Sequence, residues 1–95
     1  MWKCLCTNII RSVSQSCDVC GRSYEDIRPY AIRLHTIQFA LSIMSQPKHE
    51  IDSAEQEAFS LLTHNLSISE ISEELAKTTR PSTLTLARVL RNLEE

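Results

Sequence analysis

The stretch "CLCTNIIRSVSQSCDVCG", residues 4–21, contains all four cysteines of the chain, and the 74 residues that follow it contain none. The spacing is Cys-x-Cys, ten residues, then Cys-x2-Cys. Zinc takes four soft ligands in a tetrahedron, and two closely spaced pairs of thiols supply them with little loss of loop entropy. Gly21 follows the second pair and offers the backbone freedom that a turn around an ion often needs. The pattern predicts one structural zinc ion, with these ligands: Cys4, Cys6, Cys17 and Cys20.

Other uses of the cysteines stay open at this point. Two disulfides need an oxidising compartment, and the start of the chain lacks the charged and apolar regions of a signal peptide. A redox Cys-x2-Cys is expected in a βαβ context, which this sequence lacks. Lipidation would concern Cys4 and Cys6 near the start. A four-thiolate zinc site would be closed and non-catalytic, and it would supply the folding energy of a segment too short to fold alone.

Composition narrows the class of protein. The chain has 95 residues, of which 42% are hydrophobic, with one glycine and three prolines. This scarcity of chain breakers favours a mainly α protein with short connections. The sequence has no recognisable nucleophile–base set, no glycine-rich phosphate loop and no histidines at ligand spacing. We therefore expect neither an enzyme nor a small-molecule substrate.

The most apolar stretch, residues 30–44, has ten apolar residues in fifteen. It is too short to span a bilayer, and Arg33, His35 and Gln38 interrupt it. With no signal peptide recognised, the expected location is cytoplasmic, with no membrane partner.

Residues 25–47 predict a long apolar helix. Asp26 is its expected cap, Pro29 suits a first turn, and Pro47 limits the far end. Apolar residues in steps of three and four form a first line along this helix. Its members are Ile27, Tyr30, Leu34, Ile37, Leu41 and Met44.

A second apolar line runs along another flank of the same helix, through Ile32, Phe39 and Ile43. One line is enough to pack against the rest of a small domain, so two lines indicate a second contact. That contact could be the zinc segment, a second copy in a homodimer, or another protein. The alternative is that this is simply the central core helix. The residues assigned to a dimer or partner interface are Tyr30, Leu34, Ile37, Leu41 and Met44.

Residues 51–95 predict three further helices. Asp52 with Glu55 and Ser67 with Glu70 have the spacing of capping boxes. Asn65 suits the left-handed position at a helix end, and Pro81 suits a first turn. The inner faces are expected from these apolar residues: Ala54, Ala58, Leu61 and Leu62; Ile68, Ile71 and Leu75; and Leu86, Val89, Leu90 and Leu93.

A short helix, a tight turn and a helix with polar and basic outer residues match a helix-turn-helix. Residues 51–93 resemble the DNA-binding domain of LuxR-type regulators and align with its pattern without a gap. The likeness rests on Ile51–Ser53, Glu55 with Glu57, Leu61–Leu62, "LSISEI" at 66–71, and Leu86, Val89, Leu90 and Leu93. Asn65, Lys77 and Ser82 depart from the pattern of that family.

This resemblance implies double-stranded DNA as a partner. The turn would meet phosphates and the last helix would reach base edges in the major groove. Phosphate contacts would come from Lys77, Thr78, Thr79 and Arg80, and base contacts from Ser82, Thr83, Thr85 and Arg88. Residues 51–95 carry four Lys and Arg against eight acids, so the non-specific part of DNA binding would be weak.

The first residues also resemble the Ran-binding-protein (NZF-like) zinc fingers. Trp2, the ten-residue gap and the four cysteines match that class, whereas the first Cys–Cys gap is one residue short. Ile10 stands where the class has Asn, and Thr7–Asn8 where its ubiquitin-binding members have Thr-Phe. The likeness covers a fifth of the chain and implies a zinc finger without a named ligand.

Together these patterns predict a mainly α chain in three parts. Residues 1–24 form a Cys4 zinc segment, residues 25–47 a long core or dimerisation helix, and residues 51–95 a helix-turn-helix. The expected function is a small zinc-containing DNA-binding transcriptional regulator. The alternative is a zinc-stapled helical adaptor or inhibitor that binds a protein, such as a part of the transcription machinery, through the long helix.

Overall fold

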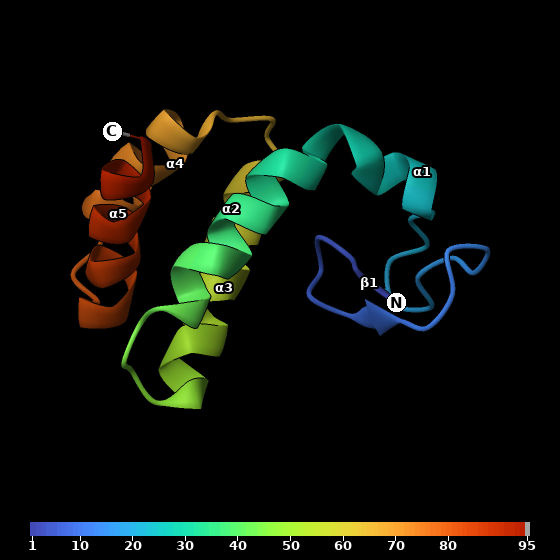
Figure 1. The fold of residues 1–95 in the computed structure, drawn as a ribbon, viewed down its shortest axis with the longest axis horizontal. Helices are drawn as coiled ribbons and strands as arrows, with labels where there is room; N and C mark the ends of the chain where they lie inside the picture. The colour runs from blue at the N-terminus through green and yellow to red at the C-terminus, as the bar shows by residue number, and fades with distance from the viewer. Residues whose placement is uncertain (95) are drawn as a thin grey trace.

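The computed structural model describes residues 1–94, with side chains through Leu93. It is mainly helical, as the sequence predicts, and its N-terminal part consists of a small β-hairpin and a loop that together hold the cysteines. Figure 1 shows the hairpin at one end, the antiparallel pair α2 and α3 in the middle, and α4 with α5 at the other end. The elements are β1 (Trp2–Lys3), β2 (Ile9–Ile10), α1 (Tyr24–Ile27), the 3₁₀ helix η1 (Arg28–Tyr30), α2 (Ala31–Ser42), α3 (Lys48–Leu62), α4 (Ile68–Ala76) and α5 (Pro81–Glu94).

The hairpin is an element that the sequence patterns do not predict. Its two strands pair antiparallel, with Trp2 opposite Ile10. The indole N–H of Trp2 donates to the carbonyl oxygen of Ser12 at 2.9 Å, and its ring meets that of Tyr24 edge-on at 5.7 Å. Trp2 thereby anchors both the hairpin and the start of the helical region.

The long helix is interrupted and shorter than predicted. Helical turns run from Tyr24 to Ser42, with η1 between α1 and α2, because Pro29 has no N–H for an α-helical bond. The cap is Ser23, whose hydroxyl accepts from the Asp26 N–H, while the Asp26 carboxylate accepts from the Ser23 N–H at 2.9 Å. Asp26 is therefore the partner of the cap and not the cap itself.

The predicted start of α3 at Asp52 is wrong. This helix begins four residues earlier, directly after Pro47, whose extended ψ of 151° turns the chain into the helix. The Asp52–Glu55 capping box does not form, and Glu55 lies buried in the helix interior. Pro47 thus limits the next helix and not the preceding one.

The predicted signals at the ends of α3, α4 and α5 are confirmed. Asn65 has a left-handed φ of 59°, and Ser67 with Glu70 forms a capping box at the start of α4. Pro81 is the first residue of α5. One prediction fails: Leu93 is 41% exposed, because the buried face of α5 lies along Ser82, Thr83, Leu86, Ala87 and Leu90.

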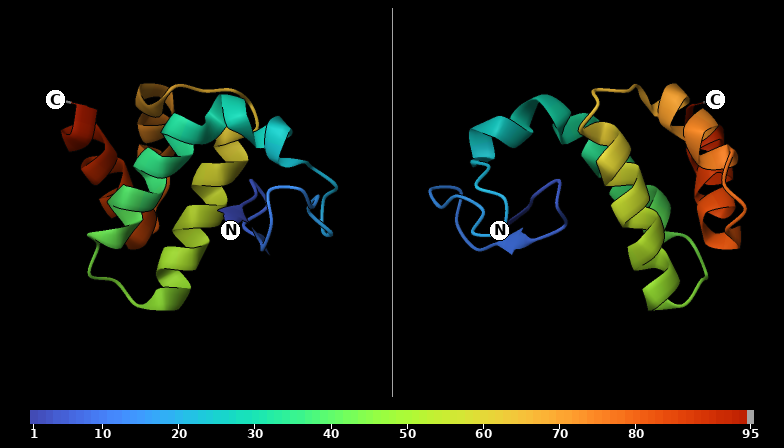
Figure 2. Two further views of the ribbon diagram at one scale, coloured as in Figure 1. Left: turned by 45° about the vertical axis from the view of Figure 1, so that its right-hand side comes forward. Right: turned by 180° about the vertical axis from the view of Figure 1, so that it is seen from behind.

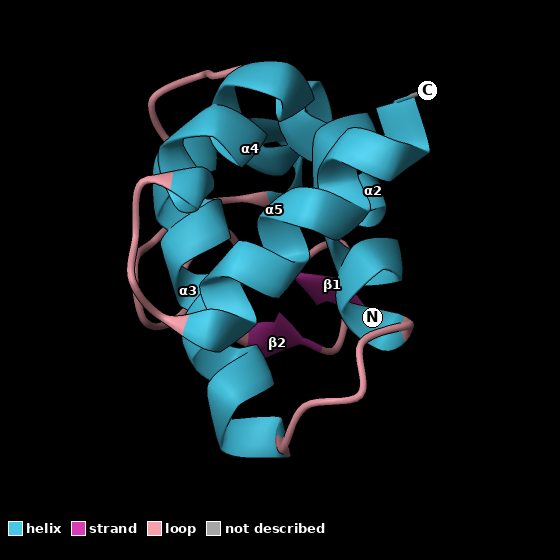
Figure 3. Ribbon diagram, turned by 90° about the vertical axis from the view of Figure 1, so that its left-hand side faces the viewer, coloured by secondary structure: helices cyan, strands magenta, loops and turns pink. Residues whose placement is uncertain are grey.

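The core lies where α2, α3, α4 and α5 meet. Figure 2 shows α2 and α3 side by side from two directions, and in Figure 3 α4 and α5 run alongside each other in roughly opposite directions. The largest fully buried apolar side chains come from all four of these helices: Phe59, Ile37, Leu62, Ile71, Leu86 and Leu90. The buried set extends into the hairpin through Trp2, Leu5 and Ile10.

One ion pair joins the hairpin to the helices across 52 positions of sequence. The Lys3 ammonium donates to both carboxylate oxygens of Glu55, at 2.6 and 2.7 Å. Both side chains are largely withdrawn from solvent, with 23% and 11% of their surface exposed. A buried carboxylate is stable only with such a donor, so this contact fixes the position of β1 against α3.

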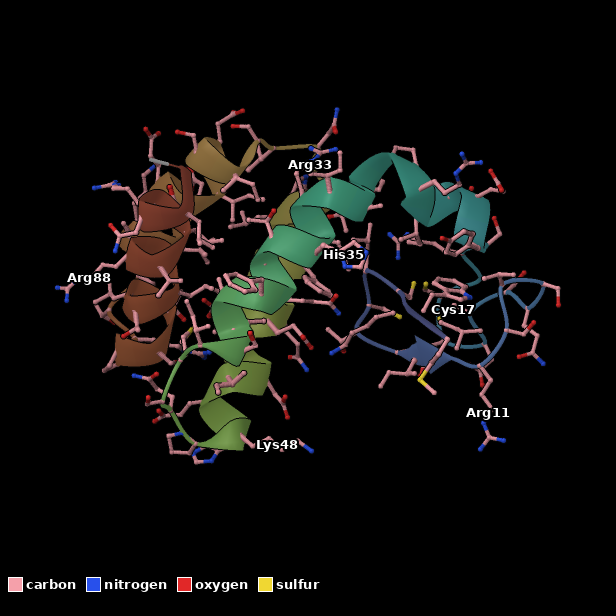
Figure 4. All side chains as sticks on the ribbon, in the orientation of Figure 1. Arg11, Cys17, Arg33, His35, Lys48 and Arg88 are labelled. Atoms are coloured by element: carbon pink, nitrogen blue, oxygen red, sulfur yellow. The ribbon has the colours of Figure 1, made fainter. Side chains whose placement is uncertain are left out.

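Replacing Lys3 by Ala should lower the free energy of unfolding by about 1–3 kcal/mol, because the buried carboxylate of Glu55 loses its donor. Chemical denaturation followed by circular dichroism measures this. Lys48→Ala is the control, since Lys48 is exposed at the start of α3 and points away from the rest of the chain in Figure 4. Equal unfolding midpoints for the two variants would contradict a stabilising role of the pair.

Candidate metal centre

Two turns bring the four cysteines together. Their sulfur atoms all lie within 4.8 Å of one another, in the part of the N-terminal segment that Figure 4 marks with Cys17. Cys4 and Cys6 lie in the turn that joins β1 to β2, and Cys17 and Cys20 lie in the loop between β2 and α1. The predicted ligand set is thus assembled as one cluster.

The first turn is closed by backbone bonds around its cysteines. The Cys4 N–H donates to the Asn8 carbonyl at 2.9 Å, and the Thr7 N–H donates to the Cys4 carbonyl at 2.9 Å. Thr7 adopts a φ of 73°, which is a strained conformation for a β-branched residue. Such strain persists only where the surroundings require it, and here it allows the chain to turn sharply after Cys6.

The second turn has the same plan, with glycine at the strained position. The Gly21 N–H donates to the Cys17 carbonyl at 2.9 Å, and the Cys17 N–H donates to the Arg22 carbonyl at 2.8 Å. Gly21 has a φ of 81°, and a methyl group placed on it would meet no atom within 4 Å. Glycine is required there for its backbone conformation and not for lack of space.

The sulfur atoms lie at distances that a metal ion could bridge. Cys4 Sγ lies 3.2 Å from Cys20 Sγ, and Cys6 Sγ lies 3.5 Å from Cys17 Sγ. Four sulfurs at about 2.3 Å from a zinc ion would be about 3.8 Å apart, and a disulfide would be near 2.05 Å. The four thiols are free, and their sulfur atoms are close enough together to be ligands of one ion.

Burial and hydrogen bonds divide the thiols into two kinds. Burial raises the pKa of Cys4 to about 12 and also raises the pKa of Cys6. Burial acts in the same direction on Cys17, but bonds from the Asn8 amide and the Cys20 and Val19 backbone outweigh it and lower its pKa to about 6.

The pKa of Cys20 is lowered, like that of Cys17. Burial raises its pKa, but the Arg22 backbone N–H, the Cys4 thiol and the Arg22 guanidinium together outweigh this and lower the pKa. Each close sulfur pair therefore joins one group that favours the thiol to one that favours the thiolate. A dication would bind such a cluster by displacing the remaining thiol protons.

Two polar side chains support the cysteines, and neither is among the ligands that the sequence pattern predicts. The Asn8 amide donates to Cys17 Sγ at 3.5 Å and to the Asp18 carboxylate at 2.8 Å. The Arg22 guanidinium donates to Cys20 Sγ at 3.3 Å. Each residue follows the second cysteine of its pair by two positions, and this repeated spacing is the signal that could have identified them.

The predicted DNA contacts are only partly exposed. Ser82 is 4% exposed and Thr83 is fully buried, with its hydroxyl donating to Glu57 at 3.0 Å, so neither is presented to a base. Lys77 pairs with Glu74 at 3.0 Å, and Arg80 pairs with Glu57 at 3.1 Å.

The remaining predicted contacts lie on the outer side of the turn and of α5. Thr78 and Thr85 are half-buried, and the Thr85 hydroxyl donates to the Pro81 carbonyl at 2.9 Å. Thr79 and Arg88 are exposed, and Figure 4 shows Arg88 pointing away from the helical core. Burial and ion pairing thus leave few of these groups free for a nucleic acid.

The predicted partner interface on α2 lies mostly inside the chain. Leu34, Ile37 and Leu41 are no more than 5% exposed, while Tyr30 and Met44 are partly buried against the core. The second apolar line is the one that faces solvent. Its members are Ile32 at 84% exposed, Phe39 at 56% and Ile43 at 54%.

Comparisons with models of known protein families, with curated proteins and with solved structures find no match to this chain. The likenesses to LuxR-type domains and NZF-like fingers thus rest on the quoted residues alone. Within residues 1–94, no helix has both the length and the apolar character needed to cross a membrane.

Replacing Gly21 by Ala should weaken zinc binding about 5- to 30-fold, because an L-residue with positive φ costs about 1–2 kcal/mol. The affinity is measured by competition with a chelator of known zinc affinity. Ser16→Ala is the control, since Ser16 is exposed in the loop between the cysteine pairs. If the two variants bind zinc equally well, the turn at Gly21 does not support the site.

Proposed function

We propose that this protein is a zinc-stapled helical adaptor that binds another protein through the outer face of α2. The observation that carries the proposal is the exposure of the second apolar line, Ile32, Phe39 and Ile43. These residues are spaced at i, i+7 and i+11 on one face of the helix, with Thr36 between them. Several large apolar side chains exposed along one face of a helix in a small protein are typical of an interaction site.

The partner we propose is a protein with an apolar groove. A helix that presents anchors at such spacing binds by laying one face into a groove. No formally charged side chain lies on this face, where Thr36 is the polar residue and His35 and Ser42 flank it. A second copy would set one convex helix against another, and three side chains fall short of the roughly 800 Å² per partner that a stable interface buries. A groove also covers the flanks of the helix.

The zinc ion would act as a structural staple in this function. The hairpin and its loop contribute few buried apolar side chains, and four closely spaced thiols take the place of a larger core. Four sulfur ligands leave no position for water, so the centre would hold the N-terminal segment against α1 and α3 without chemistry of its own.

DNA binding is the second candidate, and one observation favours it. Arg88 and Arg91 are both exposed on α5, and neither has an ion-pair partner among the residues whose side chains are described. They lie three positions apart on the outer face of this helix, where a recognition helix would carry its cations. Binding through so few cations would be weak and would fall steeply with salt.

A photo-crosslinking residue tests the adaptor proposal. With p-benzoylphenylalanine in place of Phe39, irradiation in the native host should join the chain to one protein of defined mass, because Phe39 would lie in the groove of the partner. The same group in place of Arg91 is the control and should give no such product. An additional Ile32→Asp substitution should remove the product obtained at position 39, because a carboxylate cannot enter an apolar groove without loss of hydration.

Two results would contradict the adaptor. One is the absence of any crosslinked protein at position 39. The other is duplex DNA binding at low salt that Arg88→Ala with Arg91→Ala abolishes and that Ile32→Asp leaves unchanged. The latter result would favour the DNA-binding candidate.

A further inference from the structure

Arg22 is a cation in direct contact with the candidate metal centre. Its guanidinium donates to Cys20 Sγ at 3.3 Å, and among the described residues it is the only cation that donates to a cysteine sulfur. Arg22 itself is half-buried, whereas Cys20 is the one exposed cysteine of the four. The guanidinium therefore contacts the sulfur of the cysteine that is most exposed as a residue.

The charge of a loaded centre explains why a cation is needed there. Four thiolates around a dication leave a net charge of about −2, which is costly in a partly buried site. Asn8 supplies a neutral donor on the side of Cys17, and Arg22 supplies a full positive charge on the side of Cys20. The pairing also raises the pKa of Arg22, chiefly through its hydrogen bond to Cys20.

We propose that Arg22 is a positioning residue whose charge holds the Cys20 thiolate in place and so controls how fast the centre loses its metal. This inference rests on the proposed zinc site. Cys20 is the ligand at which release begins, since it is the one exposed cysteine of the four. Removing the charge at position 22 removes the main electrostatic restraint on that first step.

The test measures zinc release from the loaded full chain into excess EDTA, followed with a colorimetric zinc indicator. Arg22→Gln keeps a hydrogen-bond donor but loses the charge, and it should release zinc at least about tenfold faster, within the range known for groups that support metal ligands. Arg22→Lys keeps the charge and should stay within about threefold of the wild-type rate. Arg28→Gln is the matched control, because Arg28 is an exposed arginine that pairs with Glu25 at 3.1 Å, and it should release zinc at the wild-type rate.

The fluorescence of Trp2 in each loaded variant shows whether the hairpin is folded, because its indole is buried there. Release from Arg22→Gln at the rate of the Arg28→Gln control would overturn the inference. Equally fast release from Arg22→Lys and Arg22→Gln, with native Trp2 fluorescence, would also overturn it, because charge would then not be the cause. A wild-type chain that binds no zinc would instead overturn the site itself, so the two failures are distinguishable.

Discussion

Four sulfur atoms within 4.8 Å of one another are the constraint on which the N-terminal part of this chain depends. Thiolates at that distance repel one another, and buried thiols gain little from their weak hydrogen bonds, so a bound cation would stabilise the cluster. Both turns hold their cysteines within this cluster. Each ends in a residue with positive φ, and one of these is Thr7, for which that conformation is strained.

The helical region needs no such staple, because four helices bury a continuous apolar core. The two parts meet through Trp2 and through the Lys3–Glu55 pair, which place β1 beside Tyr24 and against α3. The outer line of α2 remains uncovered after both contacts are made. The proposed adaptor uses this surface, since the first apolar line of the same helix is mostly buried in the core.

Local signals in the sequence predicted local structure well. The cysteine spacing, the Ser67–Glu70 capping box and the left-handed Asn65 each depend on a few neighbouring residues, and all three are present.

The predictions that failed are of two kinds. Asp52 and Glu55 have the spacing of a capping box, but Pro47 starts the helix earlier, and the tertiary contact with Lys3 uses the Glu55 carboxylate. A pairing across 52 positions leaves no pattern in a single sequence. Likewise, helical periodicity identifies apolar lines on α2 without showing which of them the core will cover.

The central claim is that the four cysteines hold one metal ion, and the mass of the intact native chain tests it most directly. Under non-denaturing ionisation, protein purified without added metal should have the mass of the chain plus one zinc ion. An alkylating reagent added to the native protein in solution should leave the thiols unmodified until the metal is removed. A mass equal to that of the bare chain with four reactive thiols, or of a chain lacking the four hydrogens lost on forming two disulfides, would contradict the account.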